Sequence, residues 1–388
     1  MVRNAPIDLL RGVAIMLVLL LHYSLTYRLS KSPLADWFGV AAVRAVVNNG
    51  NYGVTMFFVV SGCLITSNTL RRFGSLAAID VQAFYVTRAA RILPPLLLAV
   101  LIIVTLGLLG VPSFGNTDGG KNLPASFYFL AVGSVLTFTH NLLMQSVGYF
   151  SYCLNIYWSL SVEEGFYLAF PLLCVLARRR ALVVAMCLCA IAIGPIYRHV
   201  HADDELYFMY GYAACFDAIA FGCLAALLAS VKCPPPRAAR WGSVAAALAL
   251  AASYLSGIHG HEAFGFTAVA AASAVLVWCA GASTGTGWAD ARWLVPLSWA
   301  GRHSYELYLF HIIVLAAMRE LLPRAQMGVD WKLPGLLLFI ATSAFVAALV
   351  ARYFSEPINA ALRARFDTAR APTRSARPVS TASADPAG

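Results

Sequence analysis

Charged residues are scarce in this chain of 388 residues, where they make up 12% of the sequence. An ordinary soluble domain carries about 25%. Hydrophobic residues, in contrast, make up 60% of the chain. This composition excludes a soluble globular protein of the usual kind and indicates a multi-pass membrane protein, in which apolar runs alternate with short loops.

The chain also lacks a basic domain of the kind that binds nucleic acid, although its formal net charge is +10. The arginines lie between apolar segments, which is the pattern that sets orientation in a membrane. We therefore expect the lipid bilayer to be a partner and nucleic acid not to be one. The nine cysteines include no Cys-x-x-Cys pair, which indicates that they serve as small hydrophobic residues.

Two predicted outer loops contain residue types that bind metals, namely 199–205 with its histidines and acids and 259–262 with the sequence His-Gly-His-Glu. Such residues could ligate a metal ion. In outer loops they are more often solvated, and we expect no metal and no permanently bound cofactor.

Eleven apolar runs are long enough to be candidate membrane spans. Short cytoplasmic loops should carry the excess of Lys and Arg, and this rule is broken if all eleven runs cross. Treating 126–143 as a re-entrant or interfacial segment places every basic cluster in the cytoplasm. We therefore predict an all-α fold of ten transmembrane helices with both termini cytoplasmic. The candidates are 7–27, 53–70, 93–111, 126–143, 160–177, 181–197, 211–230, 241–257, 264–281, 298–319 and 334–355.

The chain divides into a transmembrane domain at 1–357 and a basic tail at 358–388. The tail is rich in Ala, Arg, Ser, Thr and Pro and contains little aliphatic bulk, so we expect it to be disordered. We expect the first apolar run to be a retained helix, because it lacks a small-residue cleavage site.

The first predicted helix carries three ionisable side chains, Asp8, Arg11 and His22. Asp8 and Arg11 are three residues apart and can pair. His22 lies roughly 22 Å beyond Ile7 along the helix, and Arg11 shares its helix face. A polar group at such depth indicates function. The alternative is a structural histidine bonded to a neighbouring carbonyl.

A second polar group opens the span near 160, in the sequence from Trp158 to Leu168. Only one of its two adjacent carboxylates can face the same interior as His22. We favour Glu163, since it shares a face with Tyr167 four residues later. The alternative, above all for Glu164, is stabilisation of a helix N-terminus by negative charge.

The predicted depth of each polar residue in the membrane suggests how these residues are arranged. His22 lies late in an outward helix and Glu163 early in an inward one, so both are predicted in the outer half of the membrane. A carboxylate that orients a histidine raises its basicity, and that histidine can deprotonate an attacking hydroxyl. Arg88 and Arg91 lie at the cytoplasmic face, one turn apart, where guanidinium groups can clamp phosphate. Simple anchoring by positive charge is the alternative for these two arginines.

Other intramembrane polar residues are weaker candidates. Ser61 stands beside Gly62 in a run that also contains Gly53, where helix packing is the favoured role and an active-site role the alternative. Tyr305 and His311 belong to a later helix, and His311 is predicted to line the same cavity as His22. Asp217 is a buried charge that we expect to pair with an interior arginine.

The chain resembles the acyltransferase 3 family of integral-membrane acyltransferases over essentially 7–357. The resemblance rests on six motifs in the right order. They are Asp8-Leu-Leu-Arg-Gly-Val-Ala-Ile with His22, Phe57-Phe-Val-Val-Ser-Gly-Cys-Leu-Ile, Arg88-Ala-Ala-Arg-Ile-Leu-Pro, Trp158-Ser-Leu-Ser-Val-Glu-Glu with Phe166-Tyr-Leu, Ser304-Tyr-Glu-Leu-Tyr-Leu-Phe-His and Glu356-Pro.

The resemblance implies O-acyl transfer, usually of acetyl from acetyl-CoA as co-substrate, to a free or lipid-linked carbohydrate such as O-antigen, capsule or exopolysaccharide at the bacterial inner membrane. It implies catalysis by His22 with support from Glu163, and binding of acyl-CoA by Arg88 and Arg91. Two alternatives remain open. One is a transporter of a glycolipid precursor, since buried ionisable groups also mark transport pathways; the other is O-acylation of a small molecule such as a macrolide.

Overall fold

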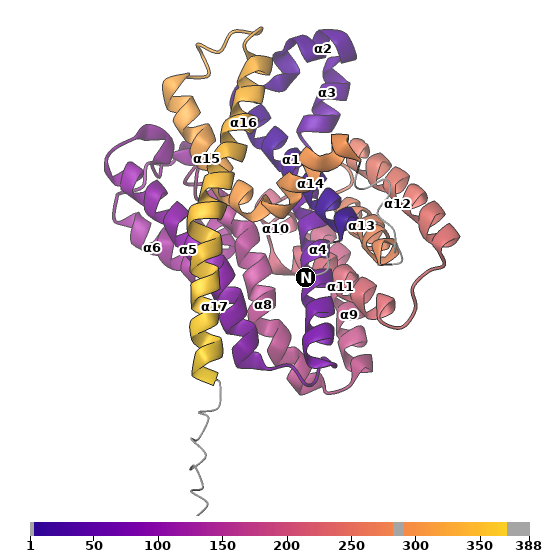
Figure 1. The fold of residues 1–388 in the computed structure, drawn as a ribbon. Helices are drawn as coiled ribbons and strands as arrows, with labels where there is room; N and C mark the ends of the chain where they lie inside the picture. The colour runs from indigo at the N-terminus through magenta and orange to yellow at the C-terminus, as the bar shows by residue number, and fades with distance from the viewer. Residues whose placement is uncertain (1–3, 282–290, 371–388) are drawn as a thin grey trace, which may run out of the picture.

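The computed structural model describes residues 4–281 and 291–370, and all regular elements in these residues are helical (Figure 1). The longer helices are α1 (Ala5–Tyr27), α4 (Asn51–Phe73), α5 (Val81–Leu108), α8 (Trp158–Ala177), α9 (Arg180–Val200), α11 (Tyr212–Ala229), α12 (Pro236–Ser256), α15 (Ser304–Leu321) and α16 (Lys332–Val350). The shorter ones are α2 (Pro33–Phe38), α3 (Val40–Val47), α6 (Phe127–Leu136), α7 (His140–Val147), α10 (Glu205–Phe208), α13 (Gly265–Ala280), α14 (Val295–Arg302) and α17 (Glu356–Arg370). Single 3₁₀ turns are η1 (Leu29–Lys31), η2 (Pro112–Phe114), η3 (Asp118–Gly120), η4 (Asn155–Tyr157) and η5 (Arg292–Leu294), and η6 (Ala351–Ser355) is a π-helical turn.

Seven helical segments of the described chain are long and apolar enough to cross a membrane. They contain α1, α4, α5, α8, α9, α11 and α16. The other predicted spans at 241–257, 264–281 and 298–319 also fold as helices, but these are shorter or less apolar. The prediction of an all-α, multi-pass membrane protein is confirmed.

Two predicted segments are interrupted. The run at 126–143 forms α6 and α7, which are separated at Phe138, where φ is +58°. With 10 and 8 residues, each piece is too short to span a bilayer, which needs about 20. This agrees with a re-entrant or interfacial segment. The prediction of one helix over 298–319 is wrong, because α14 ends at Arg302 and α15 begins at Ser304.

The predicted tail begins as an ordered helix. α17 continues from η6 through Arg370 and packs beside α5, where Arg363 donates a 3.5 Å hydrogen bond to the Thr87 carbonyl (Figure 1). The expected disorder is therefore wrong for 358–370. The remaining positions, 371–388, lie outside the described residues.

Glycines bring three pairs of helices into close contact. A Cβ on Gly62 of α4 would lie 2.1 Å from the Ile219 carbonyl oxygen of α11, and one on Gly53 would lie 2.6 Å from the Ala14 carbonyl oxygen of α1. Packing roles for Gly53 and Gly62 are thus confirmed. A Cβ on Gly301 of α14 would lie 1.8 Å from the Asp8 carbonyl oxygen of α1, so α1 and α14 cross at backbone contact.

We expect Gly301→Ala to destabilise the protein by about 1–3 kcal/mol, because the added methyl group must push α14 away from α1. Thermal unfolding in detergent measures the change. Gly133→Ala in α6 is the matched control, since a Cβ there meets nothing within 4 Å. Equal unfolding temperatures for the two variants would show that the α1–α14 crossing tolerates expansion.

A buried ion pair joins three helices. Arg198 of α9 donates a 2.6 Å hydrogen bond to Asp217 of α11, and their side chains are 0% and 1% exposed. The same guanidinium donates to Thr267 of α13 at 2.5 Å. Asp217 therefore pairs with an interior arginine, as predicted, and ties α9 and α11 to α13.

Candidate active site

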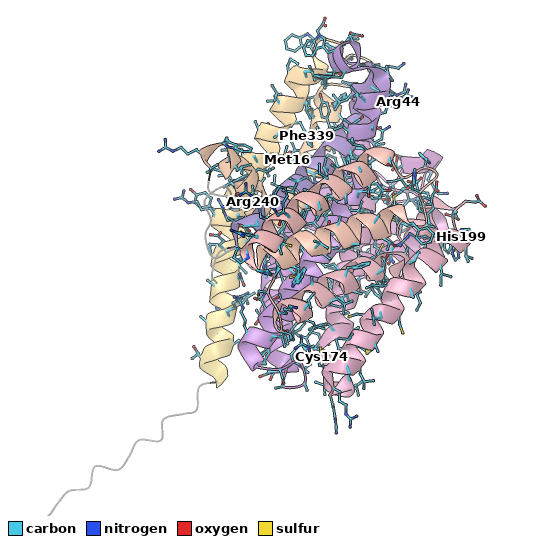
Figure 2. All side chains as sticks on the ribbon, turned by 90° about the vertical axis from the view of Figure 1, so that its right-hand side faces the viewer. Met16, Arg44, Cys174, His199, Arg240 and Phe339 are labelled. Atoms are coloured by element: carbon cyan, nitrogen blue, oxygen red, sulfur yellow. The ribbon has the colours of Figure 1, made fainter. Side chains whose placement is uncertain are left out.

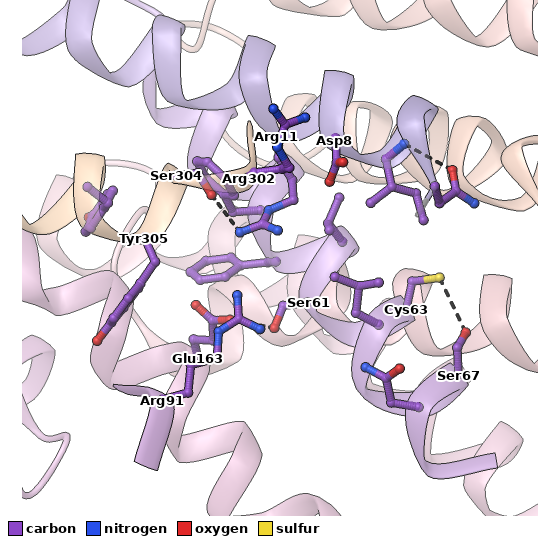
Figure 3. A pocket seen from close by; sticks show the side chains of 18 of the residues that line it. Asp8, Arg11, Ser61, Cys63, Ser67, Arg91, Glu163, Arg302, Ser304 and Tyr305 are labelled. Atoms are coloured by element: carbon purple, nitrogen blue, oxygen red, sulfur yellow. Dashed lines mark hydrogen bonds between the residues drawn. The ribbon is translucent and has the colours of Figure 1, made fainter. Parts of the chain in front are cut away.

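A cavity of about 720 Å³ lies between α1, α4, α5, α8, α14 and α15. Figure 3 shows side chains from several of these helices pointing into it. Arginines outnumber acids on its wall, so it is electropositive. The charged lining residues are Asp8, Arg11, Arg71, Arg88, Arg91, Glu163, Glu164 and Arg302.

Arginines reach the cavity from three sides. Arg11 of α1 donates a 2.7 Å hydrogen bond to the Ser304 hydroxyl at the start of α15 (Figure 3). The Arg88 guanidinium of α5 lies 4.3 Å from the centre of the Tyr167 ring of α8. Arg91 follows one turn later on α5 and also lines the cavity. The two α5 arginines therefore belong to the wall of the cavity.

Glu163 is the centre of a short hydrogen-bond network. Its carboxylate accepts a 2.6 Å hydrogen bond from Ser61 of α4 and a second one from the Tyr167 hydroxyl, and Ser61 and Tyr167 also contact one another. A packing role was favoured for Ser61, with an active-site role as the alternative, and its hydroxyl lies on the cavity wall. Ser61, Glu163 and Tyr167 form one hydrogen-bonded polar unit.

The other predicted site residues lie in different environments. Glu164 lines the cavity, is 6% exposed, and its Oε1 lacks a hydrogen-bond partner among the described residues. Tyr305 lines it too and donates a 2.9 Å hydrogen bond to the Ile92 carbonyl of α5. Trp158 is packed against Tyr210, with ring centres 4.4 Å apart, and it and Asp217 are outside the cavity wall.

His22 and His311 form a pair between α1 and α15. The Nε2 atom of His311 lies 3.2 Å from Nδ1 of His22. The Nδ1 atom of His311 is 2.8 Å from the Tyr308 carbonyl oxygen, and that of His22 is 2.9 Å from the Val18 carbonyl oxygen. His311 is fully buried, whereas His22 is only partly buried.

These distances assign the tautomers. A carbonyl oxygen only accepts, so both Nδ1 atoms carry the proton. His311 then presents an unprotonated Nε2 that accepts from Nδ1–H of His22. This leaves the Nε2 lone pair of His22 available, which is the arrangement a general base needs.

Glu163 and His22 were predicted to contact one another, but each has other partners. Glu163 accepts hydrogen bonds from Ser61 and Tyr167, and His22 pairs with His311. The reason is a difference in helix depth. Gly53 packs on Ala14, and α4 then runs on toward the start of α1 and past it. Ser61, roughly 12 Å further along α4, lies near the level of the start of α1, and Glu163 lies there with it. Figure 1 accordingly shows the N-terminus at mid-height of the molecule and α4 continuing below it.

Tyr308 connects the cavity to the histidine pair. Its hydroxyl lies 2.6 Å from the Ser159 hydroxyl, and both residues line the cavity. The other side of the Tyr308 ring faces His311, with ring centres 5.9 Å apart. The histidine pair therefore stands directly behind one wall of the charged cavity.

Sequence reasoning missed three contributors to this site. Arg302 stands two residues before Ser304, at the helix break that was predicted as continuous helix. Arg71 was interpreted only as an orientation signal, yet it lines the cavity and donates a 2.6 Å hydrogen bond to Asn68. The position of Tyr308 near the site could have been predicted, since it lies one turn from His311 on the same helix face.

The two loops considered for metal binding do not assemble a ligand set in the part of the chain that the structure describes, where no three His, Cys, Asp or Glu residues are grouped suitably. The His201 ring instead stacks between Tyr197 and Tyr207, with ring centres 4.2 and 5.3 Å away.

The fold and site define an integral-membrane protein whose helices enclose an electropositive cavity. The chain belongs to the acyltransferase 3 family, whose model, described as an acyltransferase domain, matches residues 4–353. No solved structure matches the chain significantly.

Two curated relatives are O-acetyltransferases by name. "Putative peptidoglycan O-acetyltransferase YrhL" of Bacillus subtilis (strain 168) is 27% identical over 337 residues, which cover 80% of this chain and 51% of the relative. "O-acetyltransferase OatA" of Staphylococcus aureus (strain NCTC 8325 / PS 47) is 32% identical over 130 residues, 32% of this chain and 20% of the relative. The chain thus spans about half the length of the first relative and a fifth of the second.

Proposed function

We propose that this protein is an O-acyltransferase that moves an acetyl group from cytoplasmic acetyl-CoA to a hydroxyl of a cell-surface carbohydrate. The observation that carries the proposal is the arginine-lined cavity backed by a histidine pair with one free ring nitrogen. Family membership and the names of the two relatives support acyl transfer, and the peptidoglycan in one name supports a carbohydrate acceptor.

The proposed donor site is the cavity. Arg88 and Arg91 bind phosphate oxygens of coenzyme A, because planar guanidinium groups match phosphate in charge and geometry. The network of Glu163, Ser61 and Tyr167 fixes the floor of the cavity and, through the Tyr167 ring, the position of Arg88. Glu163 thus acts on the donor side, and the thioester is directed toward Tyr308.

The proposed chemistry takes place at His22. The acceptor hydroxyl transfers its proton to Nε2 of His22 while its oxygen attacks the thioester carbonyl carbon. The tetrahedral intermediate then releases the coenzyme A thiolate, which takes up the proton from His22. His311 holds His22 in the reactive tautomer. In the orientation that we propose, ten helices cross the inner membrane of a bacterium, both termini are cytoplasmic, and the acyl group is passed outward.

The test is transfer of label. Purified wild-type protein is incubated with radiolabelled acetyl-CoA and surface glycans of the host, and label is followed into polysaccharide. We expect label to enter the glycan with release of coenzyme A. A transporter would leave acetyl-CoA intact, so unreacted acetyl-CoA with a full range of acceptors would contradict the proposal.

A further inference from the structure

A second cavity, of about 340 Å³, lies at the opposite end of α1 from the donor cavity. We call it the basic pocket. Four of its lining residues are cationic, and no carboxylate lines it in the described part of the chain. The lining residues are Ser24, Leu25, Arg28, Ser30, Lys31, Arg44, Asn48 and Arg324.

The local fold concentrates this charge. α1 ends at Tyr27, and the next residue, Arg28, has a φ of +55° that turns the chain sharply into η1. The ammonium group of Lys332, at the start of α16, donates to the Lys31 carbonyl at 2.7 Å and to the Arg28 carbonyl at 3.3 Å. A fifth cation therefore supports the wall of the basic pocket. Like charges that line one pocket repel one another, and an anionic ligand would relieve that repulsion.

Aromatic side chains indicate the level of the basic pocket in the bilayer. Trp37 and Phe38 on α2 are 70% and 67% exposed, and Trp331, next to Lys332, is 68% exposed. Exposed tryptophans are typical of the membrane–water interface, the level of the lipid headgroups. Figure 2 shows Arg44 at the end of the molecule opposite Cys174, which lies near the end of α8. The basic pocket is thus far from the donor side and at the height of phosphate groups.

We propose that the basic pocket binds a phosphate or diphosphate group carried by the acceptor. The inference rests on the proposed function, since it assigns the acceptor side of the same reaction. Arg28 lies six residues after His22 on α1, roughly 9 Å along the helix, so an acceptor anchored here by its phosphate presents nearby sugar hydroxyls to Nε2 of His22. Three of the four cations are arginines. A planar guanidinium group can form two parallel hydrogen bonds to phosphate oxygens, which a lysine ammonium group cannot.

Binding of inorganic pyrophosphate is the first test. The protein carries Arg88→Gln and Arg91→Gln, so that binding in the donor cavity is weakened. Adding Arg44→Glu and Arg324→Glu should raise the Kd for pyrophosphate about tenfold or more, through loss of charge-assisted hydrogen bonds. The matched control is Arg237→Glu with Arg240→Glu, which changes charge equally at exposed positions outside both cavities. An equal Kd in test and control variants overturns the proposal.

Transfer assays form the second test, in an otherwise wild-type protein. Acceptors are a polyprenyl-diphosphate-linked sugar in phosphatidylcholine vesicles and the same sugar free in solution. We expect Arg44→Glu with Arg324→Glu to raise KM for the linked sugar about tenfold, leaving KM for acetyl-CoA and the use of free sugar unchanged. An unchanged KM for the linked sugar overturns the basic pocket as acceptor site while the transferase assignment stands.

Competition identifies the source of the phosphate. Vesicles of phosphatidylglycerol should compete far more weakly than the diphosphate-linked sugar, and equal competition would make the basic pocket a general headgroup site, contrary to the proposal. If wild type transfers nothing to any acceptor, the proposed function fails. The pyrophosphate measurement then still decides whether the basic pocket binds this anion.

Discussion

Replacing His22 by alanine is expected to lower acyl transfer about 10²- to 10⁴-fold, the usual contribution of a positioned general base. The reason is specific to the histidine pair: Nε2 of His311 accepts from Nδ1–H of His22 and Nδ1 of His311 donates to carbonyls, so of the two rings it is His22 that presents an available Nε2. The measurement is the rate of label transfer from acetyl-CoA to glycan. Binding of coenzyme A should change little, because His22 is outside the donor cavity wall.

Three controls keep this prediction specific. His201→Ala, at a histidine stacked between two tyrosines away from the cavity, should retain activity. Added imidazole should restore part of the activity of His22→Ala, which would not happen if His22 only packed the helices. His311→Ala should give a smaller loss, because His22 remains but its tautomer is no longer fixed. Full activity of His22→Ala would refute the assignment.

The same variants separate two roles for His22, a general base and a transient carrier of the acyl group. Wild type is mixed with labelled acetyl-CoA without acceptor and quenched. Label bound to the protein in wild type but not in His22→Ala would indicate a carrier. For the general base, which we propose, we expect no label on the protein.

Much of the fold could be predicted because it depends on local composition. Apolar runs of about 20 residues give helices wherever they occur, and close packing at Gly62 follows from the absence of a side chain. The break at His303 was missed although the sequence carries a signal for it, because Gly301, Arg302, His303 and Ser304 interrupt the apolar run there. The helix from Glu356 to Arg370 was missed for a different reason. Its sequence is polar, and its order comes from packing on α5.

The site was predicted as a set of residues more accurately than as a geometry. His22, Glu163, Arg88 and Arg91 are all partly buried and lie in or beside one region, as polar groups in a membrane are expected to be. Their partners depend on how deeply each helix is set. We predicted the depth of each residue in the membrane by counting from the ends of its helix, and this count put Glu163 at the level of His22. In the structure, α1 starts near mid-height of the molecule, while α4 and α8 extend below it. The relative depth of these helices could not be predicted from the sequence.

Replacing both Arg88 and Arg91 by alanine is expected to raise KM for acetyl-CoA about 10²- to 10⁴-fold, from the loss of two charge-assisted contacts of about 1.5–3 kcal/mol each. The single variants should each lose about 10- to 100-fold. Arg→Lys replacements should recover only part of the loss, since lysine keeps the charge but not the planar fork. The measurement is the initial rate of transfer against acetyl-CoA concentration.

A truncated donor tests whether Arg88 and Arg91 act through the phosphate groups of coenzyme A. S-acetylpantetheine carries the thioester but no phosphate, so the double variant and wild type should use it at similar, low rates. Arg237→Ala with Arg240→Ala, outside the cavity, should match wild type on both donors. If the double variant were equally impaired on both donors, Arg88 and Arg91 would be supporting the cavity's shape through contacts such as that with Tyr167. If it were unimpaired on acetyl-CoA, Arg11, Arg71 and Arg302 would be left as the phosphate ligands, and the donor would enter past the start of α1.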